Sequence, residues 1–193
     1  MKYQEYLQLV KSDLYRHTKK LTGHTFFKCF FFSPGFRYTF LMRTTKYLSH
    51  WPNLLKGFYV LSRWALYHYK VKYGIDIPYN TNVGPGLYIG HFGGIFVNYT
   101  AKIGKNCNIN HDVTIGATYG GSHPGVPFIG DNVYFGPGSK VIGGIKVGNH
   151  VAIGANSVVS MDIPDKAVVI GNPGRIVSEK GSTNYIVNTD WEC

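Results

Sequence analysis

The sequence is short of cysteine, of long hydrophobic runs and, in its first third, of acidic residues. Three cysteines in 193 residues, Cys29, Cys107 and Cys193, are too few and too scattered for a disulfide framework or a CxxC metal site. The two most apolar stretches, 26–36 and 54–69, are interrupted by basic residues and are too short to cross a bilayer. The chain also starts without the apolar segment of a secretory signal. We therefore expect a cytoplasmic protein.

Acidic residues are scarce in one part of the chain only. Residues 1–70 hold 12 Lys and Arg against 2 Asp and Glu, whereas residues 71–193 hold 8 of each. Of the 24 glycines, 21 lie after residue 70, and 18 of the 30 aromatic residues lie before residue 71. A disordered chain is excluded because 44% of the residues are hydrophobic. The two compositions predict two domains, at 1–70 and 71–178, followed by a C-terminal tail at 179–193.

The second block repeats with a period of six residues, which fits neither an amphipathic helix nor an alternating strand. Every sixth residue is large and apolar, the next is often glycine, and the fifth position of each unit is small or β-branched. The ten apolar positions are Val97, Ile103, Ile109, Ile115, Ile129, Phe135, Val141, Val147, Ile153 and Val159. This period predicts a triangular solenoid in which three short strands make one coil. The glycines are expected at tight corners, where they have little steric cost.

The register is interrupted once. Ile115 and Ile129 are 14 residues apart, so about eight residues beyond one repeat leave the solenoid. The glycines and prolines of this segment predict an exposed loop at 117–128, and loops that project from rigid scaffolds often carry function.

The repeat pattern [Ile/Val]-Gly-x-x-[small]-x resembles that of the hexapeptide-repeat acyltransferases, whose fold is a left-handed parallel β-helix. Within that group, four segments follow the order found in serine acetyltransferases and in the related O-acetyltransferases of polysaccharide biosynthesis. These segments are IDIPYN (75–80), YIGHFGGIFVN (88–98), NINHDVTIGATYGGSHP (108–124) and VVIGNPGRIV (168–177). The resemblance implies a mainly β protein, a left-handed β-helix with an α-helical N-terminal domain.

The resemblance also implies the parts of an active site. His91 falls on the catalytic histidine, Asp76 on the carboxylate that pairs with it, and His123 on a second active-site histidine. Acetyl-CoA is implied as co-substrate, without a metal, and a homotrimer is implied with its active sites between subunits. The residues implied to lie along the pantetheine arm are Gly116, Ala117, Gly136, Pro137 and Ala155. Arg175 is a further candidate, for a CoA phosphate.

Two histidines also stand out on the residues alone. His91 occupies an apolar slot six residues before Val97, and an ionisable ring is costly there unless it is used. Asp76 lies 15 residues earlier, close to one coil, so it can orient the ring and raise its basicity. The alternative is a core histidine bonded to a backbone carbonyl. His111 is a candidate for lining the acceptor pocket, or a solvated surface residue.

Two other kinds of chemistry fit the sequence less well. Three histidines on such a scaffold suggest a zinc hydratase, but their intervals of 20 and 12 residues do not match its ligand spacing. Cys107 fills a fifth position of the repeat, which predicts a buried small hydrophobe rather than a nucleophile.

The acceptor is expected to be a sugar. Serine acetyltransferases have an Asp directly before the catalytic histidine, where this chain has Gly90, and a second substrate-binding Asp has no match in the shorter N-terminal extension. We therefore expect acetyl transfer to a hydroxyl of a capsular or exopolysaccharide precursor. The alternatives are serine O-acetylation and a non-catalytic hexapeptide scaffold.

Residues 1–70 are expected to form three or four helices. Their aromatic residues predict packing against the open end of the solenoid, which would otherwise expose strand edges, and a role in assembly. A second hypothesis is peripheral attachment to the inner face of the cell membrane, because basic and aromatic residues together suit an anionic leaflet. No nucleic-acid partner is expected, since no recognition motif accompanies the charge.

Overall fold

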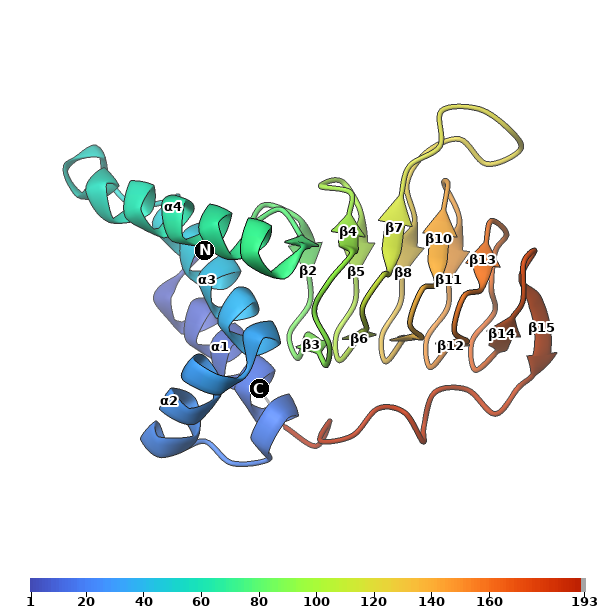
Figure 1. The fold of residues 1–193 in the computed structure, drawn as a ribbon, viewed down its shortest axis with the longest axis horizontal. Coiled ribbons are helices and arrows are strands. Elements are labelled where there is room, and N and C mark those ends of the chain that lie inside the picture. Colours follow the sequence, from blue (N-terminus) through green and yellow to red (C-terminus); the bar gives the residue numbers. More distant parts are fainter. Residues whose placement is uncertain (192–193) are drawn as a thin grey trace.

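The computed structural model describes residues 1–191; Cys193, the third cysteine, lies outside the described residues. Figure 1 shows a bundle of helices at one end of an elongated prism of short strands. The helices are α1 (Tyr3–Thr18), α2 (Gly23–Phe32), α3 (Pro34–Leu48) and α4 (Lys56–Tyr73), with a 3-10 turn η1 (Asn53–Leu55) before the last.

Local sequence explains where these helices begin and end. The Ser33 hydroxyl accepts a hydrogen bond from the Phe36 amide, and Pro34 occupies the first helical position of α3. The Thr22 hydroxyl caps α2 in the same way through the Thr25 amide. Gly74 ends α4 in the left-handed conformation, where the absent side chain removes the steric penalty.

The strands form three faces of a prism, and neighbouring coils pair in parallel. Face A consists of β1 (Ile75–Asp76), β4 (Ile95–Val97), β7 (Thr114–Gly116), β10 (Lys140–Ile142) and β13 (Val158–Val159). Face B consists of β2 (Asn82–Val83), β5 (Lys102–Ile103), β8 (Phe128–Ile129) and β11 (Lys146–Val147). Face C consists of β3 (Tyr88–Ile89), β6 (Asn108–Ile109), β9 (Tyr134–Phe135), β12 (Ala152–Ile153), β14 (Val168–Ile170) and the antiparallel β15 (Arg175–Ser178). This arrangement confirms the predicted left-handed parallel β-helix with an N-terminal helical region.

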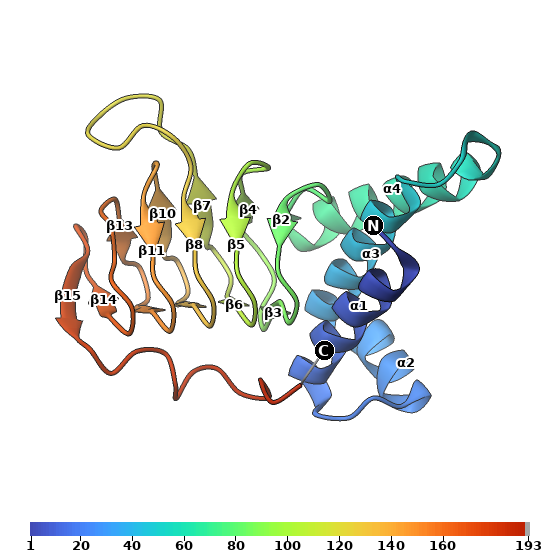
Figure 2. The same ribbon diagram turned by 180° about the vertical axis from the view of Figure 1, so that it is seen from behind.

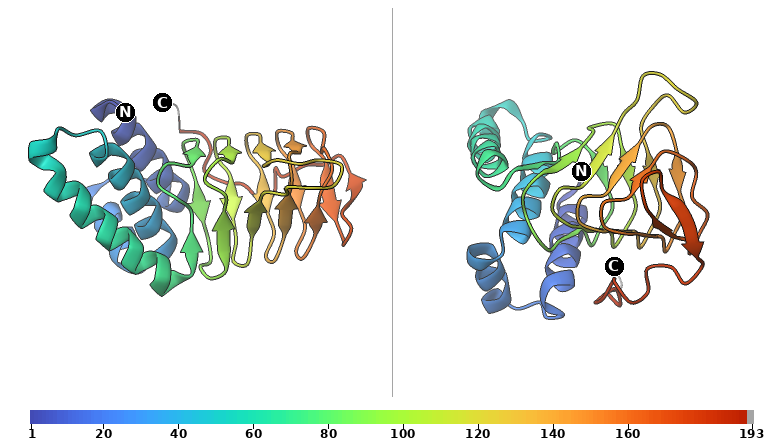
Figure 3. Two further views of the ribbon diagram at one scale, coloured as in Figure 1. Left: turned by 90° about the horizontal axis from the view of Figure 1, so that it is seen from above. Right: turned by 45° about the vertical axis from the view of Figure 1, so that its right-hand side comes forward.

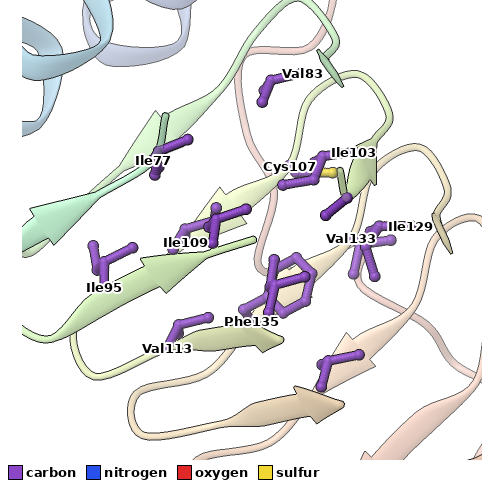
Figure 4. Close-up of a cluster of buried hydrophobic side chains, with 14 of the residues drawn as sticks. Ile77, Val83, Ile95, Ile103, Cys107, Ile109, Val113, Ile129, Val133 and Phe135 are labelled. Atoms are coloured by element: carbon purple, nitrogen blue, oxygen red, sulfur yellow. The ribbon is translucent and has the colours of Figure 1, made fainter. Parts of the chain in front are cut away.

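The core of the prism is the set of apolar positions that the repeat predicted. All ten are at most 5% exposed, and they stack in register from coil to coil, as Figure 4 shows for Ile109 beside Phe135. The fold holds one coil more than the repeat indicated, because Ile77, Val83 and Ile89 are also buried at six-residue steps. The step from Ile89 to Val97 is eight residues, so the register shifts between this coil and the next.

The glycines that follow the apolar positions serve a purpose other than the expected one. None of these glycines has a positive φ. At the corners, the left-handed backbone conformation is adopted by residues such as Asn106 (φ 55°) and Asp112 (φ 57°). A Cβ atom on Gly104 would instead lie 2.5 Å from the Gly130 carbonyl oxygen of the next coil, and one on Gly136 would lie 2.7 Å from the Ala155 nitrogen. Glycine is therefore needed for the close approach of successive coils.

The helices cap the open end of the prism, as the aromatic-rich sequence predicted. The buried Arg43 guanidinium donates to the carbonyl oxygens of Val83 and Gly84, each at 2.6 Å, and to the Asp13 carboxylate. Asp13 in turn accepts from the Leu87 amide at 2.8 Å. These contacts occupy backbone groups of the first coil that would otherwise be unpaired. Figure 3 shows α1 and α3 beside this coil.

The C-terminal segment after β15 runs back along the prism to the helices (Figure 2). Ser182 donates its amide hydrogen to the His150 carbonyl at 2.9 Å, and the Tyr185 ring stacks on Tyr134 with 4.6 Å between centroids. The Arg16 side chain of α1 donates to the Val187 carbonyl at 2.8 Å. The segment therefore ties both parts of the chain together.

Residues 1–191 hold neither a membrane-spanning helix nor a cluster of metal-binding side chains. None of their helices is both long and apolar enough to cross a membrane. Nor do three or more His, Cys, Asp or Glu side chains gather there in a way that suits a metal ion.

Candidate functional site

The predicted site residues lie around face A of the prism. Face C and face A meet at a corner. Four strand residues of face C pair in register across successive coils: Ile89, Ile109, Phe135 and Ile153. The residues two positions after them therefore lie at equivalent places on this corner, and they are His91, His111, Pro137 and Ala155. We call this row the C–A edge. It brings the predicted catalytic histidine, a predicted substrate residue and two predicted CoA-binding residues into one line.

His91 is exposed, so it is not the core histidine of the alternative interpretation. The prediction that it occupies an apolar slot of the repeat is also wrong, because the buried residue in that row is Ile89, which pairs with Ile109. Its ring meets that of His111 edge to face, with 5.9 Å between centroids. An accessible imidazole can accept a proton from a bound hydroxyl group.

Gly90, next to His91, is exposed, but a side chain at this position would meet two neighbouring side chains. A Cβ atom there would lie 3.1 Å from Cε1 of the Tyr88 ring and 3.5 Å from the Asn110 side-chain oxygen. Tyr88 in turn packs against the His17 ring of α1, with 4.5 Å between centroids. The region that an Asp side chain would enter is therefore bordered by an aromatic ring held in place by the helical part.

Asp76 lies in β1, at the end of face A nearest the helices. Its carboxylate pairs with Lys70 of α4 at 2.8 Å, and no hydrogen bond among residues 1–191 joins it to His91. Both charged groups line a cavity of about 330 Å³ together with Arg63, Tyr38 and other residues from α3, α4 and the first coil. The sequence pattern did not single out Lys70, because it lies in the aperiodic first block.

His123 lies at the opposite edge of face A. The loop at 117–127 leaves the prism after β7 and projects from it (Figure 3), and the His123 carbonyl accepts a hydrogen bond from the Gly144 amide at 2.9 Å. Gly144 follows the end of β10, whereas His91 precedes the start of β4. Within one chain, the two predicted active-site histidines are thus separated by the width of face A.

The predicted CoA-binding residues divide between the two edges. Gly136, Pro137 and Ala155 lie at the C–A edge, while Gly116 ends β7 at the other edge and Ala117 begins the loop. A cavity of about 480 Å³ is lined by Ala117, other loop residues and the 98–100 turn. Arg175 belongs to β15 at the far end of face C, so it is not part of face A.

Cys107 is buried, and burial raises the pKa of its thiol to about 12. A thiol with this pKa is protonated at neutral pH and is a poor nucleophile. This supports the interpretation of Cys107 as a core residue.

One functional feature was missed at the sequence level. Phe96 is 53% exposed in the middle of face A, and Phe92, next to His91, is 50% exposed. The two side chains give this side of the prism an exposed apolar area. The signal was available: Phe96 is an outward position of a strand and yet is aromatic.

Comparison with known proteins finds similarity in sequence and in fold. The family model described as bacterial transferase hexapeptide (six repeats) matches residues 127–160. A serine acetyltransferase from Mycobacterium tuberculosis is 37% identical over 134 residues, which are 68% of this chain and 57% of the relative. The chain therefore matches little more than half the length of this relative.

Two solved structures have the same fold. The serine acetyltransferase from Brucella abortus in complex with coenzyme A superposes with a TM-score of 0.75 and 27% identity, over 94% of this chain and 71% of that one. The serine acetyltransferase from Neisseria gonorrhoeae in complex with serine gives a TM-score of 0.71 and 28% identity, over 91% and 70%.

These relatives correct the prediction of the acceptor. The expectation of a sugar in capsular or exopolysaccharide biosynthesis is wrong, because the relatives found are serine acetyltransferases. The prediction gave too much weight to Gly90, whereas similarity extends over 134 residues. The chain thus contains hexapeptide repeats, matched by a bacterial transferase model over residues 127–160, and it resembles the serine acetyltransferases in both sequence and fold.

Proposed function

We propose that the protein is a serine O-acetyltransferase that moves an acetyl group from acetyl-CoA to the hydroxyl of L-serine. The observation that carries the proposal is the 37% identity to a serine acetyltransferase over 134 residues. The structural neighbours that contain coenzyme A and serine supply the two ligands expected. The C–A edge, with its exposed histidine, supplies a group suited to the chemistry.

The proposed mechanism needs one base, because a thioester is already an activated acyl donor. His91 takes the proton of the serine hydroxyl as its oxygen attacks the thioester carbonyl carbon. The tetrahedral adduct then breaks its carbon–sulfur bond, and the CoA sulfur leaves and is protonated. His111 faces His91 and is suited to contact the acceptor. Asp76 is proposed to orient His91. For this, the Asp76 carboxylate has to leave Lys70 and pair with the His91 ring instead.

We propose a homotrimer in which each active site lies between two prisms. His91 and His123 lie at opposite edges of face A, so one chain does not bring them together. Packing one prism against the next would set the loop of one subunit opposite the C–A edge of its neighbour. His123 would then bind the hydroxyl or the oxyanion, or share the proton transfer. Burial of Phe92 and Phe96 would stabilise that contact.

We also propose that the protein works in the cytoplasm and contacts the inner face of the cell membrane through residues 1–70. The support is the excess of ten positive charges in this part of the chain, since anionic lipids attract basic segments.

The test is release of the CoA thiol by the purified full-length protein, with and without L-serine. Serine-dependent release is expected, and His91→Ala should lower its rate by about 10² to 10⁴-fold with an unchanged circular dichroism spectrum. His24→Ala, a change at an exposed histidine of α2, is the matched control and should have no effect. A folded protein without serine-dependent release would contradict the proposal.

A further inference from the structure

Helix α4 is apolar on two opposite sides. Its inward side is buried against the rest of the protein through Ser62, Leu66 and Tyr73. Its outward side carries a second line of large apolar residues at spacings of four, three and four, which places them on one face of a helix. These residues are Val60, Trp64, Tyr67 and Val71, and they are 62–69% exposed. We call this line the outer stripe.

The apolar surface extends from the outer stripe to the tip of the helical region. A groove of about 410 Å³ beside α4 is lined by Leu48, Trp51, Phe58, Leu61, Ser62, Trp64 and Ala65. Leu54, in the turn before α4, is 93% exposed. Figures 1 and 3 show this turn at the end of the molecule farthest from the prism, so a trimer built through the prisms leaves it accessible.

The charge around this surface has one sign. No Asp or Glu occurs between Asp13 and Asp76, while that segment holds 11 Lys and Arg. On α4, Lys56 and Arg63 lie along one side of the outer stripe and Lys72 along the other, all of them exposed. A partner that covers the stripe must therefore be both apolar and anionic.

Anionic bilayers meet both conditions, and a second copy of the chain does not. Two outer stripes packed together would bring the same flanking cations face to face, and like charges at short range repel. A lipid bilayer offers acyl chains to the stripe and the groove, and phosphate groups to the flanking cations. Trp64 and Tyr67 are residue types that favour the boundary between lipid and water.

We infer that the outer stripe of α4 lies in the surface of a bilayer that contains anionic phospholipid, with the helix parallel to the membrane plane. This specifies the surface behind the membrane contact proposed above, on which it rests, and it does not depend on the acetyl-transfer reaction. The acyl chains occupy the groove beside Trp64, and Lys56, Arg63 and Lys72 bind the headgroups.

The test is co-sedimentation of the full-length protein with vesicles of phosphatidylcholine alone, or of about three parts phosphatidylcholine to one part phosphatidylglycerol. Binding is expected only to the mixed vesicles. The triple variant Leu61→Ser/Trp64→Ser/Val71→Ser should bind at least about tenfold more weakly. Each flanking cation changed to Gln should weaken binding about fivefold. The matched control, Ile176→Ser/Val177→Ser, removes exposed apolar residues from β15 and should bind normally.

The outcomes separate this inference from the proposed activity. Wild-type protein that does not bind the mixed vesicles, or a triple variant that binds as the wild type does, would overturn the inference. A change in oligomer mass of the triple variant, measured by analytical ultracentrifugation, would assign the stripe to self-association and would also overturn it. Serine acetylation measured without vesicles should be unchanged in the triple variant, so loss of one property does not imply loss of the other.

Discussion

The prism and the helical region bury their apolar residues by different means. The prism repeats one unit, so that each coil offers the next the same apolar slots and the same close backbone contact at glycine. The helical region has no repeat; it is joined to the prism by individual side chains, above all the buried Asp13 and Arg43. Repetition therefore distributes stability along the prism, whereas the joint between the two parts combines this single buried ion pair with a few apolar side chains of α3 and α4 that pack into the prism core.

The largest loss of stability should come from truncating one buried apolar side chain of the prism. Phe135 is fully buried between Ile109 and Ile153, so Phe135→Ala is expected to lower the free energy of unfolding by about 3–5 kcal/mol. Urea unfolding followed by circular dichroism measures it. Phe128→Ala, at a position 48% exposed on face B, is the control and should lower it by less than about 1 kcal/mol. Equal losses would show that the slots do not carry the stability of the prism.

The joint should be nearly as sensitive. Arg43→Met leaves the Asp13 carboxylate and two carbonyl groups without their partner in a buried place, which is expected to lower the free energy of unfolding by about 3 kcal/mol. Hydrogen exchange should accelerate most at the Leu87 amide, which donates a hydrogen bond to the Asp13 carboxylate. The control Arg63→Met removes an exposed guanidinium and should change neither the free energy of unfolding nor the exchange rates. If Arg43→Met accelerated exchange equally at all amides of the prism, the contact between helices and prism would not be local.

A pH effect should belong to the joint alone. Burial, and then the nearby charge of Arg16, lower the pKa of His17 to about 4, below its usual 6.5. The unfolded chain therefore binds a proton that the folded chain does not, and stability is lost as the pH falls from about 6.5 to 4. The expected loss is up to about 3 kcal/mol. His17→Gln should flatten this slope and His24→Gln should not; an unchanged slope in the first variant would assign it to other groups.

The smallest effect is expected from the returning C-terminal segment. Tyr185→Ala removes the ring that stacks on Tyr134, at a half-exposed position, and should lower the free energy of unfolding by about 1 kcal/mol. Tyr119→Ala, in the loop and 95% exposed, is the control and should have no effect. A loss as large as that of Phe135→Ala would mean that this segment, and not the repeat, limits the stability of the prism.

The contrast also explains which features the sequence could predict. The period-six slots are recognisable because each is repeated, so the fold and the loop could be predicted. The row through His91 could not, because the eight-residue step from Ile89 to Val97 shifts the register, and the sequence placed His91 in the apolar slot that Ile89 holds. The pairing of Asp13 with Arg43, 30 residues apart, has no such signal, because nothing in either segment marks its partner. The same holds for Lys70 beside Asp76 and for the returning C-terminal segment. The acceptor was mispredicted because two departures, Gly90 and the unmatched second substrate-binding Asp of the N-terminal extension, outweighed the similarity of the rest of the chain.

The residues of the C–A edge are evenly spaced, so the edge can be used as a ruler along the prism. Phe135 and Ile153 pair across 18 residues, one complete coil, and each coil advances the edge by about 4.8 Å. The four positions from His91 to Ala155 thus mark three equal divisions, about 14 Å in all. A ligand stretched along this edge meets one side chain for each division. Inserting one coil of 18 residues between His111 and Pro137 would lengthen the C–A edge by about 4.8 Å and leave the geometry at His91 intact. The length of ligand that the edge can contact and the chemistry at His91 can therefore change independently.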